Sequence, residues 1–492
     1  MSFYIYDITF LVIFTLGVII FLYRRRHNLK REGIMYLYRT KVGIKFINYI
    51  GEKYKRTLTL FSYLAIISGY ILMASMVYFL YQILYIYLFR PDIVQAIKIP
   101  PLIPLVPYLP EAFNISFLPP FYFTYWIIAI AVIAIFHEFS HGIIARRYGI
   151  QIHTTGFGFL GPFLAAFVEP DEKQMESKPK FQQIAVLSAG TFTNLILAVL
   201  FFLLLSVFFI WAYHPAGALF NTYTPGLVNI SSITSIGGIA AINPTTQDLI
   251  NIINKNNLTD DLILGSNGNT LKLIKITSEE KTYFMTVEDL KSQLEEEKTE
   301  VVLYEDLPAI NLGLKGIIVK IDDITINENN DLINAMKEYS VGDTIKITTE
   351  GTNKNKETET LIYNLTLAED PNEEGRAVIG IGYLGGRTGM LGTIADFFNF
   401  FKDPATFYEP KFNADFVIFI YNLIWWLALI NLSVALINMW PVAIFDGGRM
   451  FMLTVWAITG SEKVGKWAFA AVTYLILGAL FLLMLGWFLA VF

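Results

Sequence analysis

The stretch "AIFHEFSHGIIARRYG", residues 134–149, joins the end of a long apolar run to a pair of arginines. It places His137, Glu138 and His141 in a segment that is otherwise suited to cross a membrane. Ionisable side chains are costly in hydrocarbon, and those found there are commonly functional. The stretch therefore predicts a membrane-embedded fold with a chemical site inside it.

The whole chain is too apolar for a soluble protein of its size, since 54% of its 492 residues are hydrophobic and only 16% are charged. Several runs reach the length of about 20 residues that a membrane-spanning helix needs. The first run is not a typical signal peptide, because no basic residue precedes it and "RRRH" follows it directly. We expect a polytopic α-helical membrane protein with about six transmembrane helices, at 7–23, 58–89, 121–146, 181–213, 414–440 and 467–492.

The distribution of Lys and Arg predicts the orientation. The loop 24–57 is strongly basic, with Glu32 and Glu52 as its only acidic residues, and further basic residues lie in the loop 147–180 and before the last span. By the positive-inside rule these loops are cytosolic. A multi-pass protein of the cell membrane is expected, with both termini and the segment 214–413 outside. The chain has no cysteine, which excludes disulfides and thiolate chemistry.

A soluble domain is predicted between the fourth and fifth spans. Residues 214–390 are much more polar, and their apolar residues occur in short strand-like pieces. The stretch "LPAINLGLKGIIVKIDDITI", residues 307–326, resembles a PDZ domain of the type found in bacterial and archaeal proteases. A generic small α/β domain without a peptide groove is the alternative.

The elements expected in this domain are a helix at 307–314, a strand at 317–321, a helix at 330–338 and strands at 343–349 and 360–368. The resemblance places Leu314, Ile318, Ile321 and Ile345 in its core. The preceding stretch 225–297 is either an insertion in the PDZ-like unit or a second small lobe.

The expected organisation has five parts. These are two N-terminal helices with a Pro-rich outer loop at 90–120 (1–120), a first membrane half (121–213), the inserted domain (214–390), a second membrane half (391–458) and a C-terminal helix (459–492). The Pro-rich loop is expected to form an irregular cap on the membrane surface.

His137 and His141 are four residues apart, so a helix places them on one face, one turn apart. Together with Glu138 they form H-E-x-x-H, the zinc peptidase pattern. Zinc lowers the pKa of water to about 7 and polarises a carbonyl, while Glu138 is placed to take the proton from water and pass it to the leaving amine. The chain has only five histidines, so the pattern is unlikely by chance.

A catalytic zinc site needs a third protein ligand and an open position. His27 and His214 are poor candidates because they are expected near opposite ends of the spans, and His153 is expected in a loop. Asp446 is the best candidate, because it follows a helix that Pro441 must break and precedes two glycines. Its helix position places it at the depth of His137. Glu169 and Asp171 are the rival ligands.

Three blocks together resemble the site-2 proteases, which are intramembrane zinc metalloproteases. They are "HEFSHGIIARRYGI" (137–150), "LSAGTFTNLILA" (187–198) and "ALINLSVALINMWPVAIFDGGRM" (428–450). The resemblance implies one zinc ion bound by His137, His141 and Asp446, with Glu138 as catalytic base. It also implies transmembrane protein substrates and an active site towards the cytosol. The composition is typical of a prokaryote, such as an archaeon.

The resemblance also implies roles for other residues. Asn194 is expected to donate to the substrate backbone or the developing oxyanion, although a hydrogen bond between helices is the alternative. Here Gly190 and the following residues replace the Gly-Pro usual before this asparagine. Asn438 and Pro441 are expected to shape the break before Asp446. The stretch "TTGFGFLGPF" (154–163) resembles the family's membrane-facing hairpin, which offers an edge to an extended substrate.

Two other functions remain open from the residues. One is a membrane zinc peptidase of another class that cleaves juxtamembrane loops, and the other is a non-catalytic PDZ membrane scaffold. The expected partners are the lipid bilayer, transmembrane substrates and, at the PDZ-like domain, peptide C-termini. Nothing in the sequence favours nucleic acid.

Overall fold

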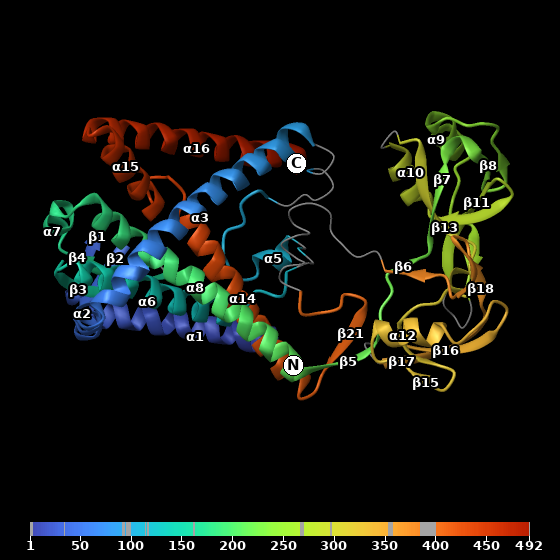
Figure 1. Ribbon diagram of the computed structural model, residues 1–492, viewed down its shortest axis with the longest axis horizontal. Coiled ribbons are helices and arrows are strands. Elements are labelled where there is room, and N and C mark those ends of the chain that lie inside the picture. The colour runs from blue at the N-terminus through green and yellow to red at the C-terminus, as the bar shows by residue number, and fades with distance from the viewer. Residues whose placement is uncertain are drawn as a thin grey trace. The chain divides into compact units, whose positions relative to one another are not determined.

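A computed structural model shows how the chain folds (Figure 1). It describes residues 3–33, 35–90, 94, 100–113, 115, 118–160, 163–265, 270–295, 298–352, 358–383 and 400–491. Parts of the Pro-rich loop 90–120, the tip of the hairpin 154–163 and the predicted boundary at 390 lie outside these residues. The chain divides into a helical unit, 1–209 with 415–492, and a second unit, 210–414.

Each of the six predicted apolar runs forms a helix. In the described part of the chain, six helices are long and apolar enough to cross a membrane. They are α1 (Phe3–Arg24), α3 (Lys55–Phe89), α6 (Phe123–Arg147), α8 (Lys180–Ala212), α14 (Ala414–Asn438) and α16 (Glu462–Val491). Many of their large apolar side chains face outward, as expected for helices that contact lipid.

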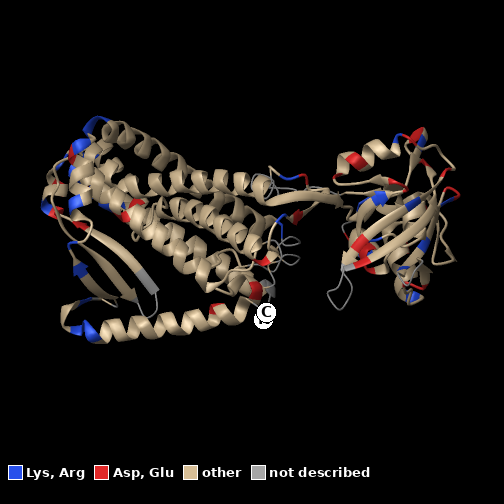
Figure 2. Cartoon of the chain, turned by 90° about the horizontal axis from the view of Figure 1, so that it is seen from below, with Lys and Arg blue, Asp and Glu red and all other residues tan. Residues whose placement is uncertain are grey.

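Basic side chains gather at one end of the helical unit (Figure 2). Arg24 ends α1, Arg147 ends α6, and Lys55 and Lys180 begin α3 and α8. Contacts join these ends, because Arg147 Nε donates to the carbonyl of Lys55 at 2.8 Å. The charge asymmetry read from the sequence is therefore an asymmetry of the folded unit.

The basic segment 24–57 is more ordered than the predicted loop. It contains a 3₁₀ turn η1 (Arg26–Asn28), β1 (Leu29–Glu32), β2 (Met35–Thr40) and α2 (Ile44–Lys53). The strands join the predicted hairpin, β3 (Ile152–Leu160) and β4 (Phe163–Pro170), in a four-stranded antiparallel sheet of order β1-β2-β3-β4. Gly156 permits this pairing, because a Cβ there would lie 2.3 Å from the carbonyl oxygen of Tyr38.

The chain breaks after α14, as Pro441 requires. A turn covers the next residues, and α15 (Asp446–Thr459) then begins at the candidate ligand. Gly447 and Gly448 allow α15 to start against this turn, since a Cβ on them would lie 2.3 Å from the Met439 carbonyl oxygen and 2.2 Å from that of Val442. Two short helices, α5 (Leu109–Ala112) and α7 (Glu172–Ser177), complete the unit.

Asp7 is the one residue of α1 that is buried, and it attaches α1 to the start of α6. Its carboxylate accepts from the backbone N–H groups of Phe123 and Thr124 at 2.8 and 2.9 Å, and from the hydroxyls of Tyr108 and Thr124. The N-cap residue of α6 itself provides no side-chain bond. Asp7 therefore caps this helix from another segment, where a negative charge also favours the helix dipole.

The described part of the second unit contains two large sheets, each with its own core. The first sheet has the order β17-β16-β14-β5-β21, with β15 paired to β14, and its core contains Leu314, Ile318, Ile321 and Ile345 as predicted. Its strands are β5 (Tyr213–Ala218), β14 (Ile317–Ile321), β15 (Ile324–Thr325), β16 (Thr344–Thr352), β17 (Thr358–Thr366) and β21 (Thr406–Pro410), with helices α11 (Pro308–Asn311) and α12 (Asn329–Met336).

The stretch left unassigned by sequence forms the second lobe. Its sheet has the order β7-β13-β12-β11-β8-β9, with β10 paired to β11. These strands are β7 (Pro225–Asn229), β8 (Ile233–Ile236), β9 (Ile239–Ala240), β10 (Leu262–Leu264), β11 (Leu271–Ser278), β12 (Lys281–Met285) and β13 (Glu300–Glu305). The 3₁₀ turn η2 (Ile230–Ser232) and helices α9 (Thr246–Lys255) and α10 (Val287–Glu295) accompany them. Small pairings join β6 (Thr222–Tyr223) to β20 (Ile381–Gly382) and β18 (Ala368–Asp370) to β19 (Glu373–Val378).

Candidate metal centre

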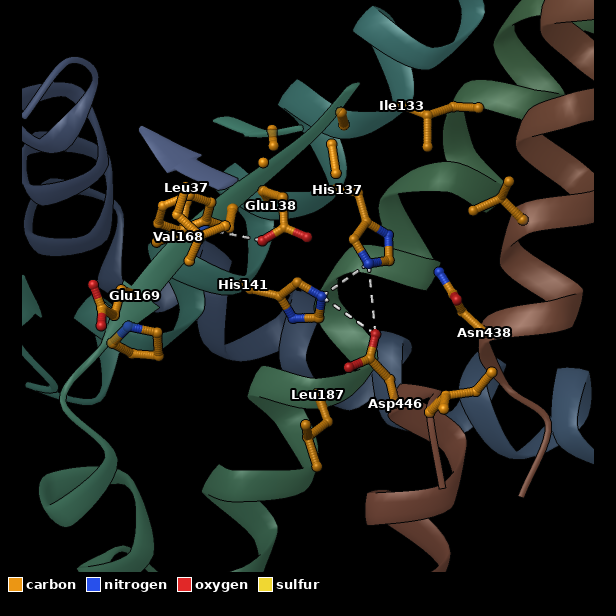
Figure 3. A pocket seen from close by; sticks show the side chains of 18 of the residues that line it. Leu37, Ile133, His137, Glu138, His141, Val168, Glu169, Leu187, Asn438 and Asp446 are labelled. Carbon is orange, nitrogen blue, oxygen red and sulfur yellow. Dashed lines mark hydrogen bonds and ion pairs between the residues drawn. The ribbon is translucent and has the colours of Figure 1, made fainter. Parts of the chain in front are cut away.

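Two helices of the helical unit bring His137, His141 and Asp446 together (Figure 3). The histidines lie one turn apart on α6, and Asp446 is the first residue of α15. The Nε2 atoms of the histidines are 3.0 Å apart, and Asp446 Oδ2 lies 3.5 Å from His137 Nε2 and 3.4 Å from His141 Nε2. Three potential donor atoms thus face one point.

The hydrogen bonds of His141 show what this point requires. His141 Nδ1 lies 2.7 Å from the carbonyl oxygen of Val186 on α8. A carbonyl only accepts, so Nδ1 carries a proton, and Nε2 is the nitrogen that presents a lone pair to a metal when the ring is neutral. That lone pair faces the carboxylate of Asp446, which also accepts. Two acceptors directed at each other fit a cation between them.

The distances also suit a single small cation. Four-coordinate zinc has bonds of about 2.0–2.2 Å to histidine and carboxylate, which places neighbouring ligand atoms about 3.3 Å apart. The observed separations of 3.0, 3.4 and 3.5 Å bracket this value. Two imidazoles and one carboxylate are also a donor set typical of catalytic zinc, with one position left open.

Gly190 on α8 makes room for both imidazoles. A Cβ at this position would lie 2.5 Å from His141 Nε2 and 2.6 Å from His137 Cε1. No side chain fits there without moving the rings. In the sequence Gly190 is only one glycine of the block 187–198, and no role was predicted for it.

Asn194, also on α8, is fully buried against His137. Its amide nitrogen is placed 3.1 Å from His137 Nδ1, and its amide oxygen has no hydrogen-bond partner among the described residues. For His137 Nε2 to present a lone pair, Nδ1 must carry the proton and donate it. The amide turned about its axis satisfies both groups, with Oδ1 accepting from Nδ1. Asn194 thus links α8 to α6 through His137, and its expected role towards the substrate stays a prediction.

Glu138 lies at the edge of the sheet. Its Oε2 accepts from the backbone N–H of Val168 in β4 at 3.1 Å. Glu138 and the three candidate ligands line one pocket of about 1050 Å³, to which β4, α14 and α15 also contribute (Figure 3). Asn438 at the end of α14 lines the same pocket, and its amide makes no hydrogen bond with the described residues. From the sequence, Asn438 was expected only to shape the break after this helix, and its position in the pocket was not predicted.

The rival ligands have other partners. Glu169 in β4 accepts from Thr154 Oγ1 at 2.5 Å and pairs with Arg39. The hydrogen bond from Thr154, followed by the contact with Arg39, holds the pKa of Glu169 below its usual range. Asp171 caps α7 by accepting from the backbone of Gln174, a bond that lowers the pKa of the Asp171 carboxyl. Neither carboxylate joins the cluster of His137, His141 and Asp446.

The remaining histidines are also elsewhere. His153 was expected in a loop, and this was wrong: it lies in β3, because residues 152–160 pair along their length with β4. Its Nε2 is 3.3 Å from Asp171. His27 lies in η1 and His214 in β5.

The fold and this centre define a class: a polytopic helical protein with a candidate site for a divalent metal between its helices. Comparison with protein families then gives the family. The model of peptidase family M50 matches residues 125–484, which is well over half of the chain. The chain therefore belongs to peptidase family M50, the metalloprotease family that includes the site-2 proteases. No curated protein matches the sequence.

Proposed function

We propose that this protein is an intramembrane zinc metalloendopeptidase that hydrolyses peptide bonds of transmembrane proteins. The observation that carries the proposal is the convergence of His137, His141 and Asp446, with acceptor atoms 3.0–3.5 Å apart, inside a unit of apolar helices. Membership of the M50 family supports it independently.

Zinc bound by these three residues would supply a Lewis acid that lowers the pKa of water to about 7 and polarises the scissile carbonyl. Glu138 then acts as general base: its carboxylate takes a proton from water and later passes it to the leaving amine. The Val168 N–H holds one oxygen of Glu138, which leaves the other free for proton transfer. Asn438 offers an amide N–H to the developing oxyanion, and Asn194 orients His137.

A substrate must reach this pocket in an extended form. A transmembrane helix protects its peptide bonds by its own hydrogen bonds, so it must unwind locally before cleavage. Among the described strands, β4 pairs only with β3, and its other edge runs along the pocket beside Glu138. This edge gives an unwound segment backbone groups with which to pair.

The orientation follows from the basic end of the helices. By the positive-inside rule we infer that this end is cytosolic, that the second unit lies outside the cell and that water reaches the site from the cytosol. We also infer that the first lobe of the second unit is PDZ-like, and that it limits the size of substrates or binds C-termini exposed by an earlier cut. Deleting 225–385 is then expected to permit cleavage of substrates with long outer domains.

The test combines zinc content with cleavage of a reconstituted transmembrane substrate. Wild type should bind about one zinc ion per chain; Asp446→Ala should lose most of it, and Glu138→Gln should keep the zinc but lose cleavage. Mass spectrometry of the products should place the cut within the transmembrane segment. Cuts confined to juxtamembrane loops would instead favour a peptidase of another class, and wild type that folds without metal would favour a scaffold.

A further inference from the structure

Helix α2 (Ile44–Lys53) has no part in the proposed reaction, yet it packs against the helix that carries the candidate ligands. Gly43 lies against Phe139, and Gly51 lies against Arg146. Between them, a Cβ at Gly142 would lie 3.2 Å from Ile47. One face of α2 is therefore fitted tightly to the last turns of α6, next to His141.

Apolar side chains just before α2 and along its first two turns are exposed. Val42 precedes the helix and is 76% exposed, and Phe46 and Tyr49 are each 53% exposed. Phe46 and Tyr49 are three residues apart in the helix and so lie on one side of it, where the Phe46 ring is also 6.3 Å from that of Phe139 on α6. We name Val42, Phe46 and Tyr49 the α2 face. An apolar face of this kind on an accessible helix indicates a contact with another apolar phase.

The surroundings of the α2 face are basic. Lys41 and Lys45 are exposed, and neither pairs with a carboxylate of the described residues. Lys53 donates to the Tyr49 hydroxyl, and its ammonium lies 4.8 Å from the centre of that ring. Glu52, the only acidic residue in α2, is occupied by Arg146. The positive charge is thus not neutralised within the protein.

The position of α2 fits the boundary of a membrane. The helix ends at Lys53 and α3 begins at Lys55, whose carbonyl accepts from Arg147 at the basic end of α6. Aromatic rings and lysines together are typical of helices at the level of lipid headgroups.

We propose that the α2 face contacts the membrane and that Lys41 and Lys45 bind the phosphate groups of anionic phospholipids in that leaflet. Val42, Phe46 and Tyr49 enter the boundary between headgroups and acyl chains. Charge complementarity selects anionic over zwitterionic lipid. Through Ile47 the contact fixes the basic end of α6 relative to the membrane surface.

The test uses the absence of cysteine in the chain. Phe46→Cys gives a single attachment point for a fluorophore on the full-length protein in phosphatidylcholine vesicles. A small fraction of lipid carries a nitroxide quencher on its acyl chain, with either a phosphatidylglycerol or a phosphatidylcholine headgroup. We expect the phosphatidylglycerol form to quench several times more effectively.

Two matched changes assign this preference to the lysines. Lys41→Gln with Lys45→Gln should reduce the preference, by up to about fivefold for each lysine. Lys272→Gln with Lys275→Gln, which removes the same charge from exposed positions in β11 of the second unit, should leave it unchanged.

Three results would overturn the proposal. Equal quenching by the two lipids would show apolar contact without headgroup selection. Absence of quenching, as expected for a reference label at the 94% exposed Ile242 of the second unit, would show that the α2 face is in water. Quenching lost only at high protein density would show that a second copy covers the face.

Discussion

Replacing Gly190 with alanine should damage the metal centre while leaving the fold intact. The new methyl group would lie 2.5 Å from His141 Nε2, and 2.6 and 2.7 Å from His137 Cε1 and Nδ1. Normal contact between such atoms begins at about 3.5 Å, so the rings must move by about 0.8–1.0 Å. A metal site tolerates errors of only about 0.2 Å in its bond lengths.

The expected result is a loss of zinc affinity of at least 10- to 100-fold, the range found when the support of a ligand histidine is removed. Alanine is also the better helix former, by up to about 1 kcal/mol, so α8 itself should not be weakened. Zinc affinity is measured by competition with a chelator, with thermal unfolding as a check on the fold.

Gly478→Ala is the matched control, because a Cβ at this position of α16 meets no atom within 4 Å. It should keep the zinc affinity of wild type. If Gly190→Ala also bound zinc as tightly as wild type, the packing of the imidazoles on α8 would not define the site, and the assignment of His137 and His141 as ligands would be undermined.

Three further predictions separate the roles of other residues. Asn194→Ala should weaken zinc binding about 10- to 100-fold, because His137 loses its orienting partner. Asn438→Ala should keep the zinc and lower kcat by about 100- to 1,000-fold if its amide contacts the oxyanion. The reverse pattern would exchange the two roles. Asp7→Ala should lower stability by about 1–2 kcal/mol through loss of the cap on α6, measured as a drop in the thermal midpoint, while Asp415→Asn in the exposed first turn of α14 should cause little change. The fold lowers the pKa of Glu169, so the ionised carboxylate stabilises the protein above its unfolded pKa, and this stabilisation is lost as the pH falls through the lower folded pKa. The difference in thermal midpoint between wild type and Glu169→Gln should therefore vanish in acid. A difference that grew in acid would contradict the role of Thr154 and Arg39.

The sequence alone was sufficient for features that depend on local periodicity. Each apolar run became a helix because its length and composition leave no other stable state for its backbone in lipid. The pairing of His137 with His141 follows from the helical period, and the break before Asp446 follows from Pro441. The core residues of the first lobe were also predicted, but from the resemblance of residues 307–326 to a PDZ domain rather than from local periodicity.

Long-range contacts decided the rest. Asp446, Glu169 and Asp171 are all plausible ligands in sequence, and only the tertiary structure shows that Asp446 is the one that lies beside His137 and His141. Strands β1 and β2 lie in a basic stretch that was expected to be a loop. They pair with each other, and β2 also pairs with β3, which Gly156 permits. The sequence left open whether 225–297 is an insertion or a second lobe, and the buried core of this stretch shows that it is a second lobe.

The contacts of Gly190, Asn194 and Asp7 were also apparent only in the tertiary structure. A glycine, an asparagine and an aspartate in apolar segments have no local pattern that reveals their partners. The separation along the chain is 49 residues from Gly190 to His141, 57 from Asn194 to His137 and 116 from Asp7 to Phe123. The sequence thus determined which chemical groups are available and which helices carry them. The fold determined which groups meet, because a metal centre depends on distances between segments that no periodicity within one segment can set.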